Sequence, residues 1–184
     1  MVNINWDVVF YFGSMTLKPA ASGIAVPTYG NYGGPGYSEG VFAPPSPPYE
    51  PAVDVLDAQF LAHDVASAAA LSPSQQSEAD LALLQSVVAL DPVELDAEAS
   101  LYAGLTTLTM IGRLAAEGDL NLLSPIQTFV AVVDAAHDIG HGVAGLDAEE
   151  RQQAQDWLLA AADTTLHAFT ESLAWPASSE WWVG

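Results

Sequence analysis

The apolar residues of the chain follow two different patterns, one before and one after residue 50. Residues 7–12, DVVFYF, are β-branched and aromatic, which is typical of a strand. Proline and glycine then concentrate in residues 25–57, and this favours loops. Pro44-Pro45 and Pro47-Pro48 favour a stiff, extended connection. We therefore expect the first fifty residues to form a strand-and-loop arm.

After residue 50, alanine and leucine dominate and apolar residues recur at the spacing of a helix. Proline or aspartate opens each predicted helix, and Gly118, Gly140 and Gly142 are interpreted as stop signals. The predicted helices span residues 51–70, 73–89, 92–117, 123–140 and 147–174. The prediction is a mainly α-helical protein of antiparallel helices, with an arm at 1–50, a helical body at 51–174 and a tryptophan-rich tail at 175–184.

The composition excludes several classes of function. The 23 acidic residues outnumber the 3 basic ones and give a net charge of −20, so phosphate backbones should repel the protein and nucleic-acid binding is not expected. The absence of cysteine excludes disulfides, thiolate ligands and cysteine nucleophiles. Charges or breakers interrupt the apolar runs before about 18 residues, so no transmembrane segment is expected. No signal peptide is visible, and the sequence does not indicate an oligomeric state.

Residues 29–40, YGNYGGPGYSEG, match two motifs that imply different chemistry. The last five residues fit the G-x-S-x-G pattern of a serine hydrolase, but that motif needs a strand before Ser38 and a helix after it, and the proline- and glycine-rich flanks fit neither. Alternatively, Gly33, Gly34 and Gly36 give the backbone the freedom to turn carbonyl groups towards a cation. Hard cations such as Ca²⁺ prefer oxygen ligands of this kind. We prefer the cation loop.

A histidine follows the loop on the first predicted helix. On a helix, residues 51–64, PAVDVLDAQFLAHD, place His63 on the apolar stripe of Leu56 and Phe60, with Asp57 and Asp64 on an adjoining stripe. A single histidine on such a stripe is more often a core residue than a functional one. A histidine beside an aspartate within reach of a cation loop is a better candidate for catalysis.

In this order, the loop YGNYGGPGY, the segment VDVLD and the pair His-Asp resemble the secreted-type phospholipase A2 family. In that family a calcium loop of Y-G-C-Y-C-G-x-G-G type precedes a helix that carries D-x-L-D and His-Asp. The resemblance implies a phospholipase A2-like core and bound Ca²⁺. It implies that the carbonyls of Tyr32, Gly34 and Gly36 and the carboxylate of Asp64 bind the calcium. It also implies that His63 is the general base, with the N–H of Gly34 at the oxyanion.

The resemblance covers residues 29 to about 67, and the sequence departs from the family pattern within it. The loop and helix cysteines of the family are absent, and Ser67 stands where the family commonly has a tyrosine one turn after the histidine. Residues 73–117 do not align with the family.

The mechanism also requires a carboxylate that orients His63 through its second ring nitrogen. Asp134, His137, Asp138 and His141 have the spacing of one helix face. Asp134, followed by two alanines, resembles the second catalytic aspartate of the family, so we favour Asp134, with Asp138 second and Asp163 third.

The expected function is calcium-dependent hydrolysis of a glycerophospholipid ester at a membrane surface, and the family resemblance and the acidity suggest secretion. One alternative is an HD-type metal-dependent phosphohydrolase with His63, Asp64, His137, Asp138 and Asp163 around transition metals. Another is a calcium-binding interaction module that has lost catalysis. The sequence does not indicate head-group or acyl preference.

Overall fold

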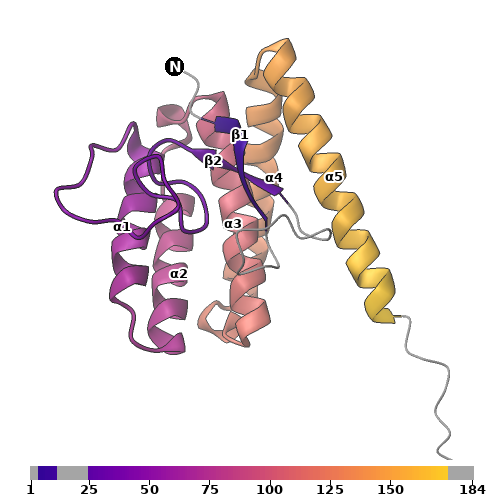
Figure 1. Ribbon diagram of the computed structural model, residues 1–184. Helices are drawn as coiled ribbons and strands as arrows, with labels where there is room; N and C mark the ends of the chain where they lie inside the picture. Colours follow the sequence, from indigo (N-terminus) through magenta and orange to yellow (C-terminus); the bar gives the residue numbers. More distant parts are fainter. Residues whose placement is uncertain (1–3, 12–24, 174–184) are drawn as a thin grey trace, which may run out of the picture.

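A computed structural model describes residues 4–11 and 25–173, with side chains described for 4–6 and 26–161. Within these ranges the protein is mainly helical, with five α-helices and one two-stranded antiparallel sheet (Figure 1). This confirms the prediction of a mainly α-helical protein with a strand in its N-terminal arm. The tryptophan-rich tail predicted at 175–184 lies outside the described residues.

Both strands of the sheet belong to the N-terminal arm. Strand β1 (Ile4–Tyr11) pairs with β2 (Ala25–Tyr29), with Ile4 opposite Tyr29 and an irregularity in register between Asn5 and Val9. The first strand was predicted, although it begins three residues earlier. The second strand lies where loops were expected, and that expectation was wrong. Proline is tolerated in a strand at a sheet edge, and a sheet of two strands consists of edges.

The five helices are α1 (Val55–Ala69), α2 (Pro73–Val88), α3 (Ala97–Glu117), α4 (Pro125–Gly145) and α5 (Ala148–Leu173). Each predicted helix is present. The first and third begin later than expected, because the side chains of Asp54 and Asp96 cap α1 and α3 by accepting hydrogen bonds from Asp57 and Ala99 N–H. Residues 92–94, where the third helix was predicted to begin, form a separate 3-10 turn.

Helix α4 continues through Gly140 and Gly142, so the prediction that these glycines end the helix was wrong. A Cβ atom on Gly142 would lie 2.4 Å from the backbone nitrogen of Leu101 in α3. Gly104 of α3 faces α4 in the same way, because a Cβ atom there would lie 2.5 Å from the carbonyl oxygen of Ala135. These two glycines therefore allow α3 and α4 to approach closely.

Consecutive helices lie side by side in the order α1, α2, α3 and α4, and the N-terminal strands and loop cross over α1 to α3 (Figure 1). An aromatic cluster connects these parts: the ring of Tyr102 in α3 lies 5.0 Å from the ring of Tyr29 in β2 and 5.6 Å from that of Phe60 in α1. The hydroxyl of Tyr102 also donates to the carbonyl of Pro27 at 2.7 Å. This packing fixes the beginning of the glycine loop against α1. No helix in the described part of the chain is long and apolar enough to cross a membrane.

Candidate functional site

Asp57 anchors the glycine loop to α1. Its fully buried carboxylate accepts hydrogen bonds from the backbone N–H groups of Asn31 (3.1 Å), Tyr32 (2.8 Å) and Val53 (2.9 Å). Burial raises the pKa of Asp57, and the three N–H groups oppose this shift by stabilising the carboxylate. Gly30 allows the close approach, since a Cβ atom there would lie 2.6 Å from the carboxylate. Asp57 thus holds the loop and does not face solvent.

The loop itself is held by short backbone hydrogen bonds. Tyr29 and Gly33 exchange two N–H to carbonyl bonds of 2.7 Å, and Tyr37 N–H donates to the carbonyl of Gly34 at 3.1 Å. Gly34 and Gly36 have φ angles of 148° and 67°, which side chains disfavour. The backbone conformation at Gly34 and Gly36 therefore favours glycine, and the carbonyl of Gly34 has one of its two lone pairs engaged.

Ser38 lies at the start of a two-residue hairpin turn and not at a strand-to-helix junction. Ser38 and Val41 exchange backbone hydrogen bonds of 2.8 and 3.1 Å, and both residues between them, Glu39 and Gly40, have positive φ angles. This is the geometry of a type I′ turn. The hydroxyl of Ser38 donates to Oδ2 of Asp64 at 2.6 Å. The turn is inconsistent with a nucleophile elbow and brings the loop into contact with α1.

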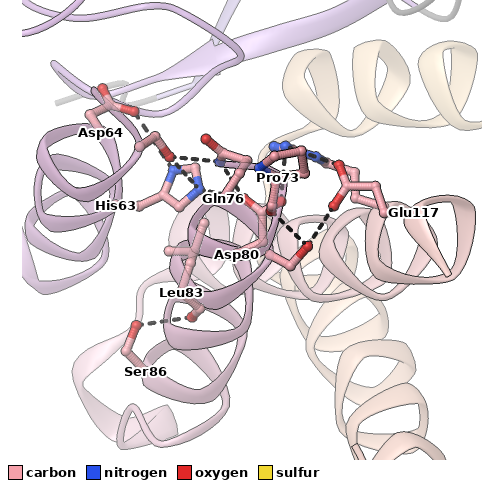
Figure 2. A network of polar contacts seen from close by, with 11 residues as sticks. His63, Asp64, Pro73, Gln76, Asp80, Leu83, Ser86 and Glu117 are labelled. Carbon is pink, nitrogen blue, oxygen red and sulfur yellow. Dashed lines mark hydrogen bonds and ion pairs between the residues drawn. The ribbon is translucent and has the colours of Figure 1, made fainter. Parts of the chain in front are cut away.

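His63 and Asp80 face one another across the α1–α2 interface (Figure 2). Nε2 of His63 lies 2.8 Å from Oδ1 of Asp80, and the Asp80 side chain is fully buried. Because a carboxylate can only accept, this contact places the proton of the neutral imidazole on Nε2 and leaves a lone pair on Nδ1. Nδ1 lies 3.8 Å from Oδ1 of Asp64, and the His63 side chain is 13% exposed. The ring is therefore not completely buried.

The electrostatic surroundings of His63 favour its protonated form. Burial lowers the pKa of His63, but the carboxylates of Asp64 and Asp80 raise it by more, so the pKa lies above the ordinary value of 6.5. An imidazole can accept a proton in a reaction and return it, and the two carboxylates stabilise the charged form that it passes through.

Asp80 is itself held by groups from two helices. Its Oδ2 atom lies 2.9 Å from NH2 of Arg113 in α3, and its Oδ1 atom accepts from the side-chain amide of Gln76 at 3.1 Å. The same amide donates to the hydroxyl of Ser67 at 2.9 Å, and that hydroxyl lies 3.2 Å from Nε2 of His63. The His63–Asp80 pair is thus surrounded by polar partners, namely Ser67, Gln76 and Arg113. The fixed carboxylate in turn fixes the orientation of the imidazole.

The carboxylate at His63 was expected from Asp134, or second from Asp138, and this expectation is corrected by the structure. Asp134 is exposed on α4, and Asp138 lines a separate cavity with His137. The physical reason is the order of packing: α2 lies against α1, whereas α4 packs against α3. The third candidate, Asp163, has a side chain outside the described residues.

Asp80 and Arg113 were not identified from the sequence, although each carries a signal. Asp80 lies one turn after Ser77, one turn before Leu84 and two turns before Val87, so a charged residue interrupts an otherwise buried stripe of α2. A buried charge requires a partner. Arg113 is one of only three basic residues in the chain.

The two His-Asp pairs do not form a common centre. His63 and Asp64 lie on α1, and His137 and Asp138 lie on α4. Among the side chains of residues 4–6 and 26–161, no three or more histidines and carboxylates gather as metal ligands. This geometry disfavours the HD-type alternative. A loop that binds a cation mainly through backbone carbonyls does not need such a cluster of side chains.

Comparisons with protein-family models, with curated proteins and with solved structures match nothing.

Proposed function

We propose that the protein is a calcium-dependent hydrolase of glycerophospholipid esters, with a phospholipase A2-like core and a water molecule activated by His63. The main support is the 2.8 Å contact between Nε2 of His63 and the buried carboxylate of Asp80, which leaves Nδ1 as the basic atom. A carboxylate–imidazole pair of this kind is a general base that needs no protein nucleophile. The hydroxyl of Ser38, the serine of the hydrolase-like motif, donates its hydrogen bond to Asp64 and not to His63.

In the proposed reaction, Nδ1 of His63 takes a proton from water, and the oxygen of that water attacks the ester carbonyl. Asp80 keeps the imidazole oriented and offsets the positive charge that it gains. Arg113 holds the second oxygen of Asp80 at 2.9 Å, so the carboxylate cannot turn away from the ring. His63 then returns the proton to the leaving alcohol, which completes the cycle without a covalent intermediate on the chain.

The glycine loop is proposed to bind the calcium ion. The 2.6 Å bond from Ser38 to Asp64 places the loop against the one carboxylate that the family resemblance assigns to calcium. The carbonyls of Tyr32, Gly34 and Gly36 would supply the remaining protein oxygens, and Asp57 holds the backbone that carries the first of them. When bound, Ca²⁺ would polarise the ester carbonyl and stabilise negative charge on its oxygen. The N–H of Gly34 is proposed as a hydrogen-bond donor to the same oxygen.

The calcium part of the proposal is tested by calorimetry and by release of fatty acid from mixed phospholipid vesicles, each with millimolar-range Ca²⁺ and with chelator. Wild-type protein should bind Ca²⁺ and release fatty acid only when it is present. Asp64→Asn should lose both, and Asp134→Asn, an exposed aspartate on α4, should keep both. Calcium binding that is unchanged in Asp64→Asn would contradict the proposed ligand set.

A catalytically inactive calcium-binding module is the second candidate, because Ser67 occupies the position of a family tyrosine. The hydroxyl of Ser67 reaches Nε2 of His63 at 3.2 Å but belongs to a much shorter side chain, and Gln76 and Arg113 supply the other contacts. If these substitutes do not support catalysis, the protein will bind Ca²⁺ and release no fatty acid. Secretion remains a prediction from the sequence.

A further inference from the structure

A second polar site lies on the side of α3 that faces α4. A cavity of about 390 Å³ is bounded by Val93 and Leu95 before α3, by Ser100 on α3, and by three residues of α4, which are His137, Asp138 and His141. The apolar wall thus faces two imidazoles and a carboxylate. The proposed hydrolysis uses none of these groups.

His137 and His141 have the spacing of metal-binding histidines on a helix. They are four residues apart, so they lie one turn apart on one face. Their rings are nearly parallel, with an angle of 11° between the planes and 6.4 Å between the centroids. Both residues are exposed, and the side chain of His137 is 72% exposed, so modest side-chain rotations can turn a nitrogen of each ring towards one ion. Pairs of histidines at this spacing are established zinc ligands.

Asp138 lies where it can orient the first of these rings. Its Oδ1 atom is 3.6 Å from Nδ1 of His137, close enough that a small adjustment would form a hydrogen bond, which would place the proton on Nδ1 and leave Nε2 with the lone pair. Metal-bound histidines generally have a carboxylate or carbonyl at the other ring nitrogen. The net charge of −20 adds a general attraction for cations.

We propose that His137 and His141 bind one divalent transition-metal ion of the zinc type at the mouth of the cavity, with Asp138 orienting His137. Imidazole ligands suit such ions, whereas Ca²⁺ prefers oxygen, so this site differs in metal preference from the glycine loop. Two protein ligands leave further coordination positions open, and the cavity lies beside them. The inference does not depend on the proposed hydrolysis.

The test is calorimetric titration of the calcium-free protein, residues 1–184, with Zn²⁺ near pH 7.5. Wild type should show one saturable binding event, and His137→Ala and His141→Ala should each weaken it at least tenfold or remove it. Asp138→Asn should weaken it by about tenfold, the usual effect of losing a carboxylate that orients a ligand. The controls are His63→Asn and His167→Ala, the other two histidines of the chain, which should leave this event unchanged.

The two alanine variants are expected to fold, because both histidines are exposed, and circular dichroism checks this. The inference is overturned if wild type binds no Zn²⁺, if binding survives in the double variant His137→Ala/His141→Ala, or if the binding event disappears only with His63→Asn. Fatty-acid release is not part of the readout, so the outcome is independent of the proposed function.

Discussion

Replacing Asp80 by asparagine isolates the electrostatic part of the proposed base. The amide has nearly the same shape, but it removes the charge that faces His63 at 2.8 Å and Arg113 at 2.9 Å. An amide can also donate to Nε2, which favours the wrong imidazole tautomer. General-base catalysis contributes about 10²- to 10⁴-fold, so we expect kcat to fall by this factor. At about 1.4 kcal/mol for each tenfold change, the loss corresponds to about 3–6 kcal/mol of transition-state stabilisation.

The same substitution should lower the free energy of unfolding by only about 1–3 kcal/mol, the range for lost hydrogen bonds to charged groups. The loss stays below that of a fully buried ion pair because the Arg113 side chain is 31% exposed and can regain water. The assay is fatty-acid release from phospholipid vesicles with saturating Ca²⁺, on protein whose folding is confirmed by circular dichroism. Asp134→Asn is the matched control and should retain wild-type kcat. Near-normal kcat in Asp80→Asn, together with a large loss in Asp134→Asn, would refute the assignment.

Three further outcomes follow from the packing and from the charge on His63. Gly30→Ala should destabilise the protein by about 1–3 kcal/mol more than Gly36→Ala in denaturant unfolding. Both glycines have positive φ angles, but only a Cβ atom on Gly30 would clash, at 2.6 Å from the buried carboxylate of Asp57. In the same assay, Gly142→Ala should destabilise the protein by about 1–3 kcal/mol, because the added Cβ atom would meet the backbone of α3. Gly140→Ala places its Cβ atom in open space, so it should be neutral or stabilising by up to about 1 kcal/mol. In calcium-free protein, NMR should show His63 titrating with a pKa above 6.5. Its contribution to the free energy of unfolding is full below pH 6.5 and is lost as pH rises through the raised pKa. A difference in unfolding free energy between wild type and His63→Asn that does not change with pH would contradict this.

The helices and the loop were predictable because their signals are local. Proline, serine and aspartate at helix starts act on the next few residues, and the glycines of residues 33–36 determine the backbone conformation where they stand. Gly140 and Gly142 were wrongly interpreted as helix ends: both lie inside α4, and Gly142 allows the close packing against α3 whereas Gly140 has open space around it. The close approach to Leu101 depends on a helix some forty residues earlier, which a local pattern cannot reveal.

The partner of His63 was not predictable for the same reason. Choosing between Asp80 and Asp134 requires knowing that α2 and not α4 packs against α1, which is a property of the tertiary arrangement. The available signal was energetic: Asp80 lies in a buried stripe and therefore needs a hydrogen-bonding or charged partner. His63, on the neighbouring helix, and the scarce Arg113 supply it.

The central claim is that His63 activates water for calcium-dependent ester hydrolysis. The most direct measurement is fatty-acid release from mixed phospholipid vesicles by wild type and by His63→Ala, side by side at the same Ca²⁺ concentration. Calcium binding and circular dichroism are measured on the same samples. The account predicts calcium-dependent release by wild type and a loss of at least about 100-fold in the variant, with calcium binding and fold retained. Release by His63→Ala at close to the wild-type rate, or no release by a wild type that binds Ca²⁺, would contradict it.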